Sequence, residues 1–177
     1  SKLKTIFSSV ASRISVNGFT VTETANQAQG GICVLFSDRI NKYIKKEPEC
    51  LPDGRSIWIE LSFPQRVVNI IAVYAPPSDM SDVGPARAAY WNALSGTATR
   101  RLRDSSNQLL LIGDVNAYAQ PIDVRSDANR RNPLREYVEF CRATGLVDAY
   151  RSKNGNKKEF TFFRMENSRI TYASRID

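Results

Sequence analysis

The sequence predicts an α/β protein in which sheets and helices are stacked as the layers of a sandwich. Several short apolar stretches end at Gly or Pro, as strands do. Two longer segments carry apolar residues at helical spacing. The order mixes strand hairpins with strand–helix units, which favours a mixed layered sheet over a simple parallel one.

Composition supports a single folded domain over residues 1–177. The chain has 42% hydrophobic and 24% charged residues, a net charge of +7 and no His. These values are typical of globular proteins and exclude disorder as the dominant state. The longest apolar run, 69–75, is too short to cross a bilayer, and no leader-like segment opens the sequence, so no membrane partner is expected.

Three cysteines, Cys33, Cys50 and Cys141, are present without CxxC spacing. A disulfide framework or a zinc site is therefore not expected. Cys33 and Cys141 lie within apolar patterns and are predicted to be small core residues, as in a protein from a reducing compartment.

The first third of the chain predicts a helix followed by two strands. A helical face is expected from five apolar residues: Leu3, Ile6, Phe7, Val10 and Ile14. Asn17-Gly18 ends this helix, and a short strand follows at 19–22. After a polar loop, the apolar run Ile32–Phe36 predicts a strand covered on both faces.

The middle third predicts a hairpin and a helix. Alternation over 56–62 indicates a half-buried strand, Pro64-Gln65 a turn, and 67–74 the returning strand. A helix is expected to begin near Pro85. One face of that helix would carry Tyr90, Leu94, Ala98 and Leu102.

The last third predicts a strand over 108–113, a long polar loop over 114–132 and a helix. Pro133 opens this helix and Gly145 ends it. Three short strands are expected to follow, at 147–150, 159–163 and 168–172.

Polar side chains follow three predicted strands. Tyr74, Asp114, Asn116 and Asp177 lie just past strand ends, where functional residues often gather. Carboxylate and amide oxygens suit Mg²⁺, so convergence of these groups would make a metal–phosphate site. Each has a simpler interpretation: 113–116 as a turn, Tyr74 as a strand-end residue with its hydroxyl in water, and Asp177 as a solvated carboxylate.

The absence of His excludes a Ser-His-Asp or Cys-His mechanism built from this sequence alone. Catalysis would rely on carboxylates, a metal ion, Tyr, Lys or a group supplied from outside. Residues 151–177 hold seven basic and three acidic side chains. On its own this excess fits either a nucleic-acid partner or a solvated basic face that keeps the protein soluble; the motifs described next favour nucleic acid.

Four motifs follow one another along the chain in an order and at a spacing that a known family shares: Tyr74-Ala75-Pro76, Gly113–Ala117, Glu159–Phe163 and Ser174–Asp177. Between them stand Pro121-Ile122-Asp123, Arg125-Ser126, Gly145–Asp148 and Tyr150-Arg151, and Gly30–Leu35 precedes them. From about residue 18 to 177 the chain resembles the endonuclease/exonuclease/phosphatase superfamily. It is most similar to the apurinic-endonuclease-like endonuclease domains of LINE-type non-LTR retrotransposons.

The resemblance implies a four-layer α/β sandwich of the DNase-I-like type that cleaves DNA phosphodiesters with Mg²⁺, with Mn²⁺ as the alternative. Asp114 would orient or activate the attacking water, and Asn116 would hold the scissile phosphate. Both residues would contribute to the metal site. Tyr74 would donate a hydrogen bond to phosphate, and Asp177 would hold a His.

The resemblance also implies residues that contact nucleic acid and a nuclear location. The contact residues are Thr161, Ser174, Arg175, Arg125 and Ser126.

Three groups of the superfamily are not recognisable in this sequence: an Asn in the first strand, a metal-binding Glu and the catalytic His. Glu23 is the only acid among the first 37 residues, and it follows the first predicted helix. The chain would then be the central and C-terminal part of a longer domain, a chain whose sheet another polypeptide segment completes, or a catalytically inactive module that binds nucleic acid. A phosphatase or phosphodiesterase of small substrates is the remaining alternative.

Overall fold

The computed structural model describes residues 13–16, 19–24, 32–51, 54–77, 83–102, 107–126 and 133–176. The chain forms two compact units and crosses between them three times. The first unit comprises Ser1–Ala75 and Leu102–Gly113, and the second Pro76–Arg101 and Asp114–Asp177. One domain over the whole chain stays a prediction.

The first unit contains an antiparallel sheet of three strands. In the order β1-β2-β3, these are β1 (Arg13–Val16), β2 (Phe19–Thr24) and β3 (Ile32–Ser37). Both strands predicted here, 19–22 and 32–36, are confirmed. The predicted N-terminal helix is wrong at its last residue, because Ile14 pairs with Val21 in β1; its other residues lie outside the described part of the chain.

Burial of β3 differs from the prediction. Its side chains alternate, with Phe36 buried while Leu35 is 63% exposed and Cys33 is exposed. The expected cover on both faces and the core position of Cys33 are therefore wrong. An antiparallel sheet is commonly packed on one face only, and β3 follows that rule.

The first unit also contains a four-stranded sheet in the order β4-β5-β6-β7. Its strands are β4 (Glu49–Cys50), β5 (Ser56–Phe63), β6 (Arg66–Tyr74) and β7 (Asn107–Asp114). The predicted hairpin is confirmed: β5 and β6 pair antiparallel from Phe63↔Arg66 to Ser56↔Val73, around the turn at Pro64-Gln65. The short helix α2 (Asp38–Asn41) links the two sheets.

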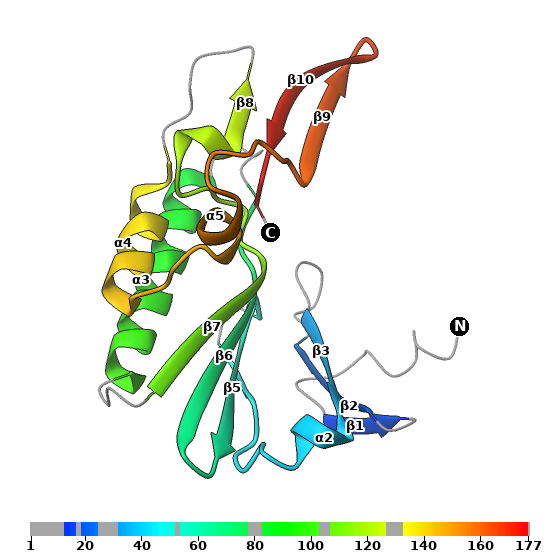
Figure 1. Ribbon diagram of the computed structural model, residues 1–177, viewed down its shortest axis with the longest axis vertical. Coiled ribbons are helices and arrows are strands. Elements are labelled where there is room, and N and C mark those ends of the chain that lie inside the picture. The colour runs from blue at the N-terminus through cyan, green and yellow to red at the C-terminus, as the bar shows by residue number, and fades with distance from the viewer. Residues whose placement is uncertain are drawn as a thin grey trace. The chain divides into compact units, whose positions relative to one another are not determined.

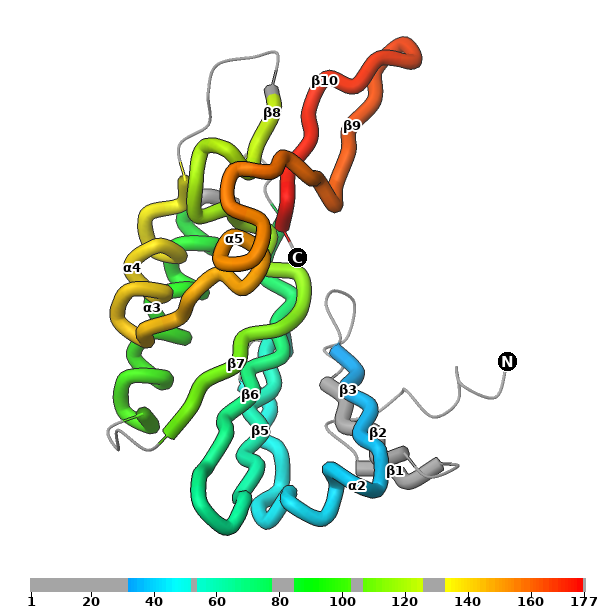
Figure 2. Tube along the Cα trace, in the orientation of Figure 1, coloured from blue at the N-terminus to red at the C-terminus, as the bar shows by residue number. Residues whose placement is uncertain are grey.

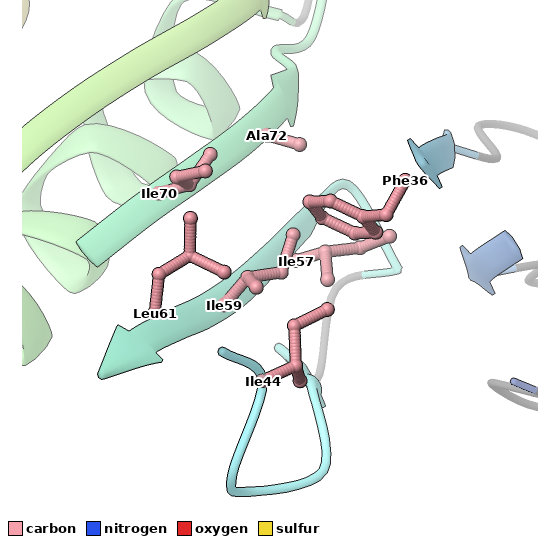
Figure 3. Close-up of a cluster of buried hydrophobic side chains, with 7 residues drawn as sticks. All are labelled: Phe36, Ile44, Ile57, Ile59, Leu61, Ile70 and Ala72. Carbon is pink, nitrogen blue, oxygen red and sulfur yellow. The ribbon is translucent and has the colours of Figure 1, made fainter. Parts of the chain in front are cut away.

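One face of this sheet holds the core of the first unit. Ile57, Ile59 and Leu61 recur at every second position of β5 and therefore share a face. Figure 3 shows these side chains packed with residues from β6, β3 and the segment after α2. The buried cluster is Phe36, Ile44, Ile57, Ile59, Leu61, Ile70 and Ala72.

The other face of β5 is buried in its first half, where the expected half-buried strand is wrong, while Glu60 and Ser62 remain partly exposed. Ser56 is fully buried and Trp58 nearly so. The Trp58 Nε1–H donates to Asn69 Oδ1 on β6 at 3.0 Å, which satisfies the indole inside the sheet.

Strands β6 and β7 end at the same edge of the sheet. Gly113, near the end of β7, has a φ of 111°. A Cβ at this glycine would lie 2.2 Å from the Val73 carbonyl oxygen of β6. Only a residue without a side chain allows this approach, which fixes where the two strands stop.

The second unit is built on two helices, α3 (Val83–Arg101) and α4 (Arg135–Thr144), which lie side by side (Figure 1). Both predicted helices are confirmed. The fully buried Trp91 of α3 packs on the ring of Tyr137 at 4.7 Å and that of Phe140 at 5.2 Å. Gly145 caps α4 with a left-handed φ of 68°.

A small antiparallel sheet completes the second unit in the order β8-β10-β9. Its strands are β8 (Val124–Ser126), β9 (Phe162–Glu166) and β10 (Arg169–Ser174), and β9 and β10 run side by side as a hairpin (Figure 2). The strands predicted at 159–163 and 168–172 are confirmed in kind but lie farther along the chain. The loop predicted over 114–132 is wrong in part, because it contains the 3₁₀ helix η1 (Pro121–Asp123) and β8.

The strand predicted at 147–150 is wrong, because the helix α5 (Ala149–Asn154) begins there. Asp148 is its N-cap, and its carboxylate accepts a hydrogen bond from the Arg151 backbone N–H at 2.9 Å. A side-chain cap of this kind favours a helical turn over an extended one. No helix among the described residues combines the length and apolar character needed to span a bilayer.

We expect Gly113→Ala to lower the free energy of unfolding by about 3 kcal/mol or more, because the methyl group meets backbone and the φ is strained. Gly145→Ala is the matched control: its φ is also positive, but nothing lies within 4 Å of its added Cβ. The control should cost about 1–2 kcal/mol. Urea unfolding of both variants measures the difference, and equal costs would show that the approach to Val73 is not a constraint.

Candidate functional site

The segment from Asp114 to Asn116 forms a tight turn at the end of β7. The Asn116 backbone N–H donates to Asp114 Oδ1 at 2.9 Å, the contact that defines an Asx turn. Asn116 has a φ of 45°, a conformation that Asn tolerates better than most residues. The motif therefore does form the turn that its simpler interpretation predicts. The same turn fixes the position of the Asp114 carboxylate relative to Asn116.

Two distant segments hold this turn in place. The Val115 backbone N–H donates to the Ile176 carbonyl at 2.9 Å. The Arg87 guanidinium of α3 donates to the Asn116 carbonyl at 2.6 Å. The carboxylate of Asp114 and the amide of Asn116 therefore project from a backbone that is fixed on both sides, next to the segment that leads to Asp177. Asp177 itself lies outside the described residues.

Tyr74 ends β6 in the first unit and is 37% exposed. Its backbone N–H donates to the Arg55 carbonyl at 3.0 Å, which continues the β5–β6 ladder by one pair. In the sequence Tyr74 follows Val73 and Asp114 follows Gly113, the two residues that meet at the sheet edge.

The residues that the resemblance assigns to nucleic-acid contact gather on and beside the small sheet of the second unit. Arg125 on β8 is exposed and pairs with Ala173, and Ser126 pairs with Tyr172. The exposed Thr161 donates its backbone N–H to the Ser174 carbonyl at 3.0 Å, and its hydroxyl accepts from the Ile176 N–H at 3.2 Å.

Two members of this group are held inside the protein. Ser174 is only 1% exposed. The guanidinium of Arg175 is engaged by carboxylates rather than projecting into solvent. Contact of these five residues with nucleic acid stays a prediction.

The sequence interpretation missed the most buried charged group of the second unit. Asp123, at the end of η1, has no exposed surface, and its Oδ1 accepts from Arg151 Nε at 2.9 Å and Arg175 Nε at 3.1 Å. Its backbone carbonyl also accepts from the Arg175 N–H at 2.9 Å. The Arg175 guanidinium also forms an ion pair with the carboxylate of Asp148. We call Asp123, Asp148, Arg151 and Arg175 the buried ion-pair network.

The buried ion-pair network joins the segment 174–176 to α5 and η1. Arg151 additionally donates to the carbonyls of Gly155 and Lys157 at 2.8 and 2.7 Å. The ring of Tyr150 packs against both guanidinium groups, 5.2 Å from that of Arg151 and 4.9 Å from that of Arg175. Because Ile176 holds Val115, the network also supports the Asp114–Asn116 turn.

No signal in the sequence marks this network. Its partners lie 28 and 52 residues from Asp123. Opposite charges at such separations are common in any chain, and only the fold pairs them. Asp123, Asp148 and Arg151 do stand within the family-like motifs, but the motifs do not indicate which of these residues pair with one another.

Cys141 is half-buried on α4, and burial raises the pKa of its thiol. Burial likewise raises the pKa of the neighbouring Tyr137 phenol. Both groups are therefore protonated near neutral pH, which makes neither a candidate nucleophile.

Known proteins resemble this chain in sequence and in fold. No family model matches the chain. Over 147 residues, 83% of its length, it is 29% identical to the uncharacterized 149 kDa protein of transposon TX1 from Xenopus laevis, and it spans 11% of that protein. Its fold is similar to that of an AP endonuclease from Archaeoglobus fulgidus, with a TM-score of 0.59, 16% identity, and coverage of 89% of this chain and 67% of the other.

The predicted resemblance is confirmed in two respects: the sequence is similar to that of a transposon protein, and the fold is similar to that of an AP endonuclease. The chain has the mixed α/β fold of the DNase-I-like type.

Removing the charge of Asp123 should destabilise the protein. Asp123→Asn leaves Arg151 and Arg175 without their shared buried carboxylate, and breaking such a pair costs about 3–5 kcal/mol. Glu139→Gln is the matched control, since it removes the carboxylate of the exposed pair with Arg135 (2.7 Å) and should cost less than about 1 kcal/mol. Urea unfolding distinguishes the two, and equal losses would contradict a structural role for the network.

Asp148 should make the free energy of unfolding depend on pH in the acidic range. Burial raises the pKa of its carboxyl, but the Arg151 backbone N–H and the Arg175 guanidinium outweigh burial and bring the pKa below the ordinary value of 3.8. This contribution to folding is present above the unfolded pKa of about 3.9 and is lost as the pH falls through the lowered value.

Asp148→Asn keeps a good N-cap residue but removes the titrating group. We expect the unfolding free energy of the variant to change less than that of the parent between about pH 5 and pH 2. Parallel pH profiles for the two proteins would show that Asp148 is not stabilised as the charged form.

Proposed function

We propose that this chain forms part of a divalent-metal-dependent DNA endonuclease of the retrotransposon type. The similarity to a transposon protein and the fold shared with an AP endonuclease support this class of enzyme. The observation that carries the proposal is the Asp114–Asn116 turn, whose carboxylate and amide stand at a strand end on a backbone fixed by Arg87 and Ile176.

A fixed turn matters because phosphodiester hydrolysis is catalysed mainly by placement and electrostatics. In the proposed reaction, Asp114 orients the attacking water and accepts its proton, while Asn116 donates from its amide to a phosphate oxygen. Tyr74 donates its hydroxyl to another phosphate oxygen. Asp177 orients a His that this sequence does not contain.

The proposed chemistry is hydrolysis of one strand. The water oxygen bonds to phosphorus, the bond between phosphorus and O3′ breaks, and O3′ takes up a proton. The products are a 3′-hydroxyl and a 5′-phosphate, so the duplex is nicked.

The donor groups of the turn fit Mg²⁺, and Mn²⁺ as the alternative. No three or more His, Cys, Asp or Glu side chains cluster as a metal site within the part of the chain that the structure describes. Mg²⁺ nevertheless requires only one or two protein carboxylates, since water and substrate phosphate supply the other oxygens. Asp114 and Asn116 would hold it, and the ion would neutralise charge that develops on the phosphate.

The positive charge of the chain supports DNA as the substrate. A net charge of +7 favours binding to a phosphate backbone through release of counterions. A nuclear location, which the family resemblance implies for an enzyme acting on chromosomal DNA, is part of the proposal.

A second candidate is a module that binds nucleic acid or a larger assembly without cutting. The observation in its favour is the net charge of +7, which favours binding to a phosphate backbone whether or not the chain cuts it. Such a module, or an enzyme whose sheet a partner segment completes, would keep salt-sensitive binding by this chain.

Substitutions in the turn test the proposal. In a plasmid-nicking assay with Mg²⁺, using this chain within its full-length coding product, Asp114→Asn and Asn116→Ala should each reduce nicking by about 10²–10³-fold. Asp38→Asn, which removes an exposed carboxylate of α2, is the matched control and should nick as the parent does.

Two outcomes would overturn the proposal. Turn variants that cut as well as the parent would exclude Asp114 and Asn116 from the reaction. A parent that binds DNA with strong salt dependence, but leaves plasmid intact with Mg²⁺ and with Mn²⁺, would favour the non-cutting module.

A further inference from the structure

Arg55 and Tyr74 face each other across the open end of the β5–β6 hairpin, within the first unit. The last pair of the ladder is Ser56↔Val73, and the next step along both strands is Arg55 opposite Tyr74. The Tyr74 N–H donates to the Arg55 carbonyl at 3.0 Å, and Arg55 Nη1 donates to the Tyr74 carbonyl at 3.3 Å. The guanidinium carbon lies 5.3 Å from the centre of the Tyr74 ring.

Arg55 is held by a turn of its own. Gly54 is buried with a φ of 64°, and its N–H donates to the Leu51 carbonyl at 2.9 Å. The Leu51 N–H donates in turn to the Ser56 carbonyl at 3.0 Å. These bonds fix the backbone on both sides of Arg55, so its side chain starts from a defined position beside the ring.

The contact restricts the ring of Tyr74. A guanidinium over an aromatic face favours the contact about two- to fivefold at an exposed site. Tyr74 is 37% exposed, so without a neighbour over its face the phenol would sample several side-chain rotamers. The planar guanidinium favours one of them and keeps a permanent positive charge beside the phenol.

We propose that Arg55 is a positioning residue for the phosphate contact of Tyr74. It holds the phenol in the orientation that donates to a phosphodiester oxygen. This inference rests on the proposed function, because it assigns a second residue to the phosphate subsite of the same enzyme.

The same hairpin contains a matched arginine–aromatic pair at its other end. Phe63 and Arg66 are register partners beside the turn, and the Arg66 guanidinium lies 5.8 Å from the Phe63 ring. Arg66→Ala therefore removes the same charge and the same kind of ring contact from the same hairpin. It leaves Tyr74 untouched.

The experiment measures binding of the chain to a duplex oligonucleotide by fluorescence anisotropy. Arg55→Ala should weaken binding about fivefold, which corresponds to the upper end of an exposed cation–π contact. Arg55→Lys should weaken binding almost as much as Arg55→Ala, since an ammonium group cannot stack on the ring as the planar guanidinium does. Arg66→Ala should stay within about twofold of the parent.

The coupling to the phenol is the decisive measurement. In a Tyr74→Phe background, which keeps the ring but removes the hydroxyl, Arg55→Ala should cost less than about twofold, because there is no donor left to position. An Arg55→Ala loss that is the same with and without the hydroxyl, or that Arg66→Ala reproduces, would overturn the proposal.

A spectroscopic readout separates this inference from the proposed function. In a chain labelled with ¹³C in its tyrosine rings, the Tyr74 signal is the one lost in Tyr74→Phe. Arg55→Ala should shift it without DNA, and Arg66→Ala should not. A parent chain that fails to bind duplex overturns both proposals, whereas binding with an unmoved ring signal in Arg55→Ala overturns only the role of Arg55.

Discussion

The second unit depends on one fully buried carboxylate. Asp123, at the end of η1, pairs with Arg151 of α5 and with Arg175 after β10. Arg175 in turn forms an ion pair with Asp148. A charge without exposed surface is tolerated only when it is paired and hydrogen bonded. One Asp123 oxygen, Oδ2, has no hydrogen-bond partner among the described residues, so the balance rests on Oδ1 and two arginines. The position of three segments follows from that pairing.

The candidate site is held in place by backbone contacts with neighbouring segments. The Asp114–Asn116 turn begins where Gly113 closes against Val73, and Ile176, next to Arg175, holds its middle residue. Its carboxylate and amide are therefore placed before any substrate arrives. Preorganised polar groups of this kind are effective because the protein, rather than the substrate, has already lost the conformational freedom.

Much of the site could be anticipated because motifs are local. Gly113, Asp114 and Asn116 are adjacent in sequence, and the structure keeps them in one turn. Thr161 and Ser174 were named from separate motifs, and a backbone hydrogen bond joins them. Asp123 could not be assigned a role, because its partners are distant in sequence. Arg55 was missed because register across the hairpin, rather than proximity in the sequence, places it on Tyr74.

By itself the sequence determined the elements whose signal is local: the β5–β6 hairpin, α3, α4 and the order of the motifs. Periodicity and turn residues act over a few positions, so they survive without knowledge of the fold. The tertiary structure decided what depends on long-range contact. It made 149–154 a helix through the Asp148 cap, exposed Cys33 on a sheet packed on one face, and buried Ser56 and Trp58 on the second face of β5. Burial and charge pairing are properties of neighbours in space, and the chain acquires those neighbours only when it folds.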